Sequence, residues 1–122
     1  MQLNYLDFDY IEDADGTGTL DAMASVSPAQ VPALHAEISA VLAWAHGQWP
    51  EACAPLEDGG MWHYDLHGSQ ESSVPLALLY DESSGTIHAT AGTPGPPRTT
   101  ITFTLSGTAD FCAALRNDFN IQ

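Results

Sequence analysis

Three side chains able to bind a metal alternate along one short stretch, His63-Tyr64-Asp65-Leu66-His67. Residues two apart in a strand point to the same face and lie roughly 7 Å apart, so either His–Asp pair could share a zinc ion. The two histidines lie roughly 13 Å apart and would need a bulge to bind one ion. His88 could join them if its strand is a neighbour. The pattern therefore predicts either a metal site or a solvated polar face of a sheet.

A run of oxygen ligands from Asp13 to Asp21 resembles part of an EF-hand calcium loop. Asp13, Asp15 and Asp21 match three of the ligand places, and Gly18 takes the place of the glycine that permits the sharp turn. The place of the bidentate glutamate is taken by Ala24, and the preceding segment has the pattern of a strand rather than a helix. The alternative to calcium binding is an acidic hairpin turn.

No motif for nucleophilic, phosphate-binding or dinucleotide chemistry is present. The chain has no GxSxG, P-loop, HExxH or helix-opening GxGxxG sequence. Cys53 and Cys112 form no CxxC pair, and no cation stands beside Cys53 to activate its thiol. Two reduced thiols are expected, with a disulfide left open. The sequence favours a non-enzymatic protein over an enzyme.

The charge balance is one-sided. The chain has no lysine, and its only full cations, Arg98 and Arg116, oppose 16 carboxylates, which gives a net charge of -14. Such a surface repels phosphate, so nucleic acids and anionic membranes are not expected as partners, whereas basic proteins are favoured. The alternative is that the charge only maintains solubility. Six carboxylates gather in the first segment: Asp7, Asp9, Glu12, Asp13, Asp15 and Asp21.

One aromatic residue lies off the apolar side of the predicted long helix. With Ile38 at the centre of that side, Trp44 projects beside Glu37 and Ala40. Tryptophan is enriched at binding hot spots, so Trp44 is a candidate contact residue. The alternative is that the loop at 48–60, which contains Trp49, folds over it. The candidate partner-binding residues are Asp7, Asp9, Asp13, Asp15 and Trp44.

The periodicity of apolar residues predicts the elements that position these groups. Period-two patterns predict about five strands, and period-3.6 patterns predict one long helix and one short closing helix. Strands are expected at 3–11, 19–26, 61–67, 74–81, 86–90 and 98–105, and helices from Ser27-Pro28 to Gly47 and from Ser106 or Thr108 onward. The apolar run 74–81 is expected in the centre of the sheet, covered on much of both faces. The prediction is one α+β domain over 1–122: an antiparallel sheet of about five strands, in the order β-β-α-β-β-β-α, with both helices on one face.

Three functions follow from these patterns. The chain has no basic-then-apolar leader and no apolar run long enough to span a bilayer, so a cytoplasmic location is expected, and its composition favours a bacterial source. At the level of size and charge the chain resembles the immunity and inhibitor proteins that block basic toxins. The resemblance implies a protein-binding module engaging a basic partner. The alternatives are a metal-binding protein or metal-dependent enzyme, with zinc or calcium as the ion, and a structural homodimer joined through the alanine face of the helix, Ala33, Ala36, Ala40 and Ala43.

Overall fold

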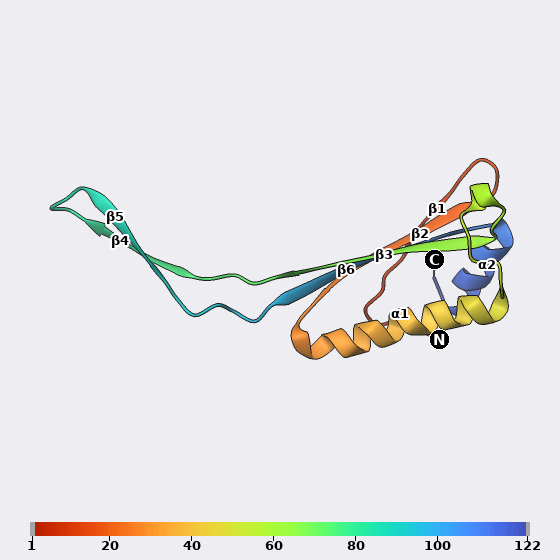
Figure 1. The fold of residues 1–122 in the computed structure, drawn as a ribbon, viewed down its shortest axis with the longest axis horizontal. Helices are drawn as coiled ribbons and strands as arrows, with labels where there is room; N and C mark the ends of the chain where they lie inside the picture. Colours follow the sequence, from red (N-terminus) through yellow and green to blue (C-terminus); the bar gives the residue numbers. More distant parts are fainter. Residues whose placement is uncertain (1, 122) are drawn as a thin grey trace.

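The computed structural model describes residues 2–121, in which six strands form two separate antiparallel sheets. The main sheet has the order β1-β2-β6-β3 (Figure 1). Its strands are β1 (Asp9–Glu12), β2 (Gly18–Val26), β6 (Arg98–Gly107) and β3 (Trp62–Glu71). The second sheet is a hairpin of β4 (Leu76–Asp81) and β5 (Thr86–Ala91). The α+β class is confirmed, but the expected single sheet of about five strands is wrong.

Two helices complete the main body. A 3-10 turn, η1 (Pro28–Gln30), leads into α1 (Val31–Gln48), and α2 (Ala109–Asp118) follows β6. The Gln30 side chain accepts a hydrogen bond from the backbone N–H of Ser27, 3.1 Å away, and Pro32 lies in the first turn of α1. The N-terminus of α2 is capped by the Thr108 hydroxyl, which accepts from the N–H of Phe111. Neither described helix is long and apolar enough to cross a membrane.

The hydrophobic core lies on one side of the main sheet. Alternate residues of β2 and β6 are buried, and the register pairs Ala22 with Phe103 and Leu20 with Leu105. The two helices bury apolar side chains in the same cluster, among them Val41 and Phe111. The opposite side of the sheet carries the polar residues that alternate with these. The sheet therefore has one covered face and one open face.

The N-terminal segment differs from its expected form. Alternation predicts a strand over 3–11, but β1 begins only at Asp9, although Leu6 and Phe8 are buried as the pattern indicates. The backbone N–H groups of Asn4, Tyr5 and Leu6 donate to the Glu37 carboxylate of α1 at 2.8–3.1 Å. Since a side chain takes these donors, the segment has no need of a neighbouring strand.

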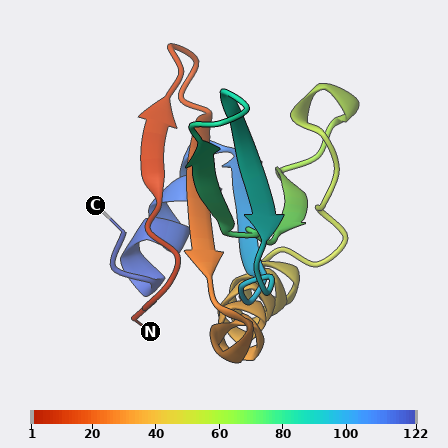
Figure 2. The same cartoon turned by 90° about the vertical axis from the view of Figure 1, so that its left-hand side faces the viewer.

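The largest correction concerns residues 74–81. The chain does not place this apolar run in the centre of a sheet, because β4 pairs only with β5. Strands β3 and β6 pair as far as Glu71 and Arg98, and the chain then continues beyond the body as a long hairpin (Figures 1 and 2). We call residues 72–97 the arm. Two backbone bonds hold its proline-rich middle part together, from Gly92 N–H to Pro75 O and from Gly95 N–H to Ser73 O, both 2.8 Å.

Candidate functional site

The alternating metal-binding candidates lie on the open face of the main sheet. His63, Asp65 and His67 stand opposite Ser106, Thr104 and Thr102 in the register of β3 with β6. On the next strand, Asp21 accepts a hydrogen bond of 2.8 Å from the Thr104 hydroxyl. The residues therefore share one face, as the spacing predicts. On that face the hydroxyl side chains of β6 lie between His63, Asp65 and His67 of β3 and a mixed row on β2 that includes Asp21 and Met23.

A hollow at one end of this face gathers several acidic groups. It has a volume of about 390 Å³, and its lining includes Asp13, Glu57, His63 and Asp65. Within residues 2–121, however, no three His, Cys, Asp or Glu side chains come close enough together to hold a metal ion. The geometry gives no support to a zinc site here, and metal binding stays an untested prediction.

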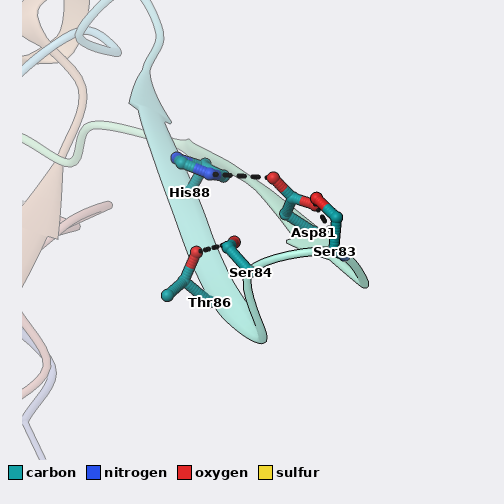
Figure 3. A network of polar contacts seen from close by, with 5 residues as sticks. All are labelled: Asp81, Ser83, Ser84, Thr86 and His88. Atoms are coloured by element: carbon teal, nitrogen blue, oxygen red, sulfur yellow. Dashed lines mark hydrogen bonds and ion pairs between the residues drawn. The ribbon is translucent and has the colours of Figure 1, made fainter.

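His88 does not join this group. It belongs to β5 in the arm, where its Nε2 lies 3.8 Å from a carboxylate oxygen of Asp81 (Figure 3). Asp81 also accepts from the backbone N–H and the hydroxyl of Ser83, at 2.9 and 2.6 Å. These bonds hold the pKa of Asp81 below its ordinary value. The network closes the tip of the arm.

Of the segment with the calcium-loop pattern, residues 13–17 form the β1–β2 hairpin turn, and Gly18 and Asp21 lie in β2. The Thr17 hydroxyl donates to Asp15 at 2.8 Å and to Asp13 at 3.3 Å. The Thr17 hydroxyl and N–H together lower the pKa of Asp15. Strand β2, rather than a helix, follows the turn. The Asp13 and Asp15 carboxylates are thus engaged in turn hydrogen bonds, and calcium binding by this segment stays a prediction.

The four acidic partner-binding candidates are exposed at this end of the molecule. Asp7, Asp9, Asp13 and Asp15 all lie at the surface. Of the two arginines, Arg98 lies away from them, whereas Arg116 packs on Tyr10 of β1, the residue that follows Asp9. Arg98 donates to Ser25 Oγ and O, both at 2.8 Å, and Arg116 stacks 4.2 Å from the centroid of the Tyr10 ring. The described surface is therefore strongly acidic here, and the role of these residues in binding stays a prediction.

Trp44 is less available than its position on the helix suggests. Its ring lies 5.6 Å from Trp49, 6.0 Å from Phe111 and 5.6 Å from Phe119, centroid to centroid. Its indole N–H donates to Asp118 at 2.7 Å. The loop with Trp49 does pack against it, so the packing alternative accounts for its position.

The two cysteines are free. Cys112 is buried and its thiol lies 3.6 Å from the carbonyl oxygen of Gly107, while Cys53 is half-buried. Burial raises the pKa of both thiols, so both stay protonated and unreactive at neutral pH. The arrangement offers no activated nucleophile at either position.

Comparison with known proteins adds no name to this geometry. No protein-family model, curated protein or solved structure matches this chain. Function must therefore be inferred from the residues and their arrangement.

The arm contributes no residue to the hydrophobic core, so its apolar side chains need another explanation. In β4 and β5, opposed residues share a face, so the register places Leu76, Leu78 and Tyr80 together with Ile87, Ala89 and Ala91. Every residue of this face is exposed, with Leu78 at 65% and Ile87 at 63%. The other face mixes Leu79 and Ala77 with threonines, His88 and Asp81. The arm is thus an amphipathic hairpin whose apolar face has no cover among the described residues.

The arm is also almost free of charge. Between Ser72 and Pro97 only Asp81 and Glu82 are acidic, both at the tip, and no residue is a full cation. The two negative charges of the arm therefore lie together at its tip. The apolar run beside a proline-rich loop was the available sequence signal, but the same signal fits a strand buried in its own sheet.

Proposed function

We propose that this chain is a non-enzymatic protein-binding module and that the apolar face of the arm is its main contact surface. The observation that supports this most is the row of Leu76, Leu78, Tyr80 and Ile87 exposed together on a projecting hairpin. Contiguous exposed apolar surface on a protein marks a binding site or an aggregation hazard. The apolar face of the arm alternates with a face of mixed polarity, which carries threonines, His88 and Asp81 beside Leu79.

The isolation of the arm strengthens the proposal. A lone two-stranded hairpin is marginally stable in water, because it has no third strand or helix on which to pack. The arm residues contribute nothing to the hydrophobic core of the body. A partner that covers the apolar face would supply the missing layer and order the hairpin.

The acidic end supports a basic protein as a second partner. Asp7, Asp9, Asp13 and Asp15 are exposed. Strand β1 and the turn that joins it to β2 lie at the end of the body away from the arm (Figure 1). Charge of one sign on one surface speeds the approach of an oppositely charged protein. An inhibitor of a basic protein would use such a surface. Neutralising Asp7 and Asp9 should then slow association with that protein and flatten its salt dependence.

A matched pair of variants tests the arm. Leu78→Thr and Leu79→Thr change the same residue type at adjacent, equally exposed positions on opposite faces. Threonine keeps the strand preference while removing apolar surface. Tagged wild type, Leu78→Thr and Leu79→Thr are used to capture proteins from the cells of origin, and the bound proteins are quantified by mass spectrometry. Proteins lost with Leu78→Thr and kept with Leu79→Thr support the proposal, and equal capture by all three contradicts it.

A further inference from the structure

The outer side of α1 is a second surface without a partner. Helical spacing places five small residues on it in one stripe: Ala33, Ala36, Ala40, Ala43 and Gly47. All but Ala40 are exposed, and Ala40 is half-buried. The buried side chains of α1, such as Leu34 and Val41, lie on the other side of the helix. A flat stripe of this kind allows another element to approach closely.

This stripe is also without charge. The only carboxylate of α1 is Glu37, which is buried and accepts hydrogen bonds from the N-terminal backbone. The helix carries no lysine or arginine. Two chains of net charge -14 repel each other, so they can associate only where neither surface adds to that repulsion. The arm and the outer side of α1 both meet this condition.

The two surfaces match in size and shape. The stripe from Ala33 to Gly47 is roughly 21 Å long at the rise of an α-helix. Strand β4, with six residues, is roughly 17 Å long. The arm presents large side chains and the helix presents small ones, so the two can interdigitate. Figure 1 shows the arm continuing along the direction of α1, beyond the end where the helix begins.

We infer that the arm of one copy packs its apolar face on the alanine stripe of α1 in a second copy, reciprocally, in a two-fold symmetric dimer. This rests on the proposed role of the arm in protein binding. The arm cannot reach the outer side of its own α1, because it projects away from that helix (Figure 1). Two copies in opposite directions place each arm along the helix of the other. Two-fold symmetry forms the contact twice, so each copy contributes both surfaces to the interface.

The dimer has a salt dependence that a basic partner would not show. Salt screens the repulsion between two acidic copies, so the dimer should tighten as the NaCl concentration rises. A complex between the acidic end and a basic protein should weaken under the same change. The sign of the salt effect therefore separates the two kinds of binding.

Sedimentation equilibrium of the purified full chain tests the inference. Wild type is expected to dimerise reversibly, and Leu78→Thr to weaken the dimer roughly a hundredfold, because the lost apolar burial counts twice. Ala36→Glu, which places a charge on the stripe, should weaken it at least as much. Leu79→Thr and His35→Glu change the opposite face of the arm and another side of the helix, and should leave the dimer intact.

Cysteine cross-linking tests the seating of the arm independently of stability. The Ala36→Cys and Ala89→Cys variants are made in separate molecules, mixed and oxidised. A mixed disulfide between them is expected, since position 36 is on the stripe and position 89 on the apolar face of the arm. Thr90→Cys, on the other face, is the control and should not form it. A disulfide of Ala89→Cys with itself alone would mean that two arms stack on each other and would overturn the inference.

The remaining outcomes are also decisive. A wild type that stays monomeric at all concentrations and salt levels overturns the dimer. If Leu78→Thr then still loses captured proteins, the arm binds another protein and the proposed function stands. A dimer that Leu78→Thr does not weaken, or that Ala36→Glu does not weaken, also overturns the inference.

Discussion

Glu37 is a buried carboxylate in a chain whose other acidic residues lie nearer the surface. It is 6% exposed, and its two oxygens accept from three consecutive backbone N–H groups at the N-terminus. Buried polar groups are costly when they lose their partners. The side chain thus takes the place of a neighbouring strand for residues 4–6.

Replacing Glu37 by glutamine is therefore expected to destabilise the fold. The amide has one acceptor oxygen, and its NH₂ group would face N–H donors, so the free energy of unfolding should fall by about 1–3 kcal/mol. The measurement is chemical denaturation of Glu37→Gln beside Glu57→Gln, which changes an exposed carboxylate in the same way. Equal stabilities of the two variants would contradict the role assigned to Glu37.

Gly107 ends β6 at a point where no side chain fits. A Cβ there would lie 2.4 Å from Cδ2 of Phe111, which is fully buried and stacked on Trp62 with ring centroids 5.5 Å apart. Gly107→Ala should lower the free energy of unfolding by about 1–3 kcal/mol through overpacking. Gly47→Ala is the control, since nothing lies within 4 Å of its Cβ, and it should stabilise α1 by up to about 1 kcal/mol. Thermal melts that rank the two variants in the reverse order would refute this packing.

At the scale of elements, local signals in the sequence predict most of the body. The alternation over 98–105 predicts β6 and the cap at Thr108 predicts α2, because these signals need only neighbouring residues. The capping box at Ser27 begins the 3-10 turn η1, and the regular helix α1 starts three residues later, at Val31. The shared face of His63, Asp65 and His67 also follows from strand periodicity. The open face and the covered face of the sheet are thus predictable.

The arm was not predictable, for a physical reason. An apolar run such as 74–80 has the same pattern whether its own chain or another molecule covers it. The position of this run is set by the pairing of β3 with β6, which extends as far as Glu71 and Arg98. Because these two residues are neighbours, the segment between them forms a single long hairpin. Similarly, the first strand starts later than its pattern predicts because Glu37 binds the backbone of residues 4–6, and Glu37 is more than thirty residues away in the sequence.

The body should fold without the arm. Replacing residues 72–97 by Asn-Gly joins the last register pair, Glu71 and Arg98, through a two-residue turn suited to a hairpin. No buried core residue is removed, so the thermal midpoint should stay within a few degrees of wild type. A change of about 1 kcal/mol in the free energy of unfolding produces a shift of roughly that size. Circular dichroism checks the melt. A shortened chain that fails to fold would show that the arm is part of the core structure.

At the scale of the whole molecule, charge opposes both folding and association. Sixteen carboxylates face two arginines, so repulsion in the compact state is greater than in the unfolded chain. Added NaCl should raise the thermal midpoint by roughly 4 °C, equivalent to about 1 kcal/mol. The control is the same series near pH 4, close to the isoelectric point, where the rise should vanish. A midpoint that ignores salt at neutral pH would contradict this account of the charge.

These properties together describe a molecule with a strongly acidic body and a projecting arm whose only carboxylates, Asp81 and Glu82, lie at its tip. Repulsion keeps the bodies apart, and the arm provides one apolar, uncharged face for contact. The acidic body and the apolar face are thus on separate parts of the molecule, since β4 and β5 form a sheet of their own. The central claim is that this face is covered by protein in the cell.

The most direct test is photo-crosslinking in the cells of origin, with benzoylphenylalanine placed at position 78 or at position 79. The account predicts abundant protein adducts from position 78, on the apolar face, and few from position 79, on the opposite face of the same strand. Equal yields from the two positions, or no protein adduct from position 78, would contradict it.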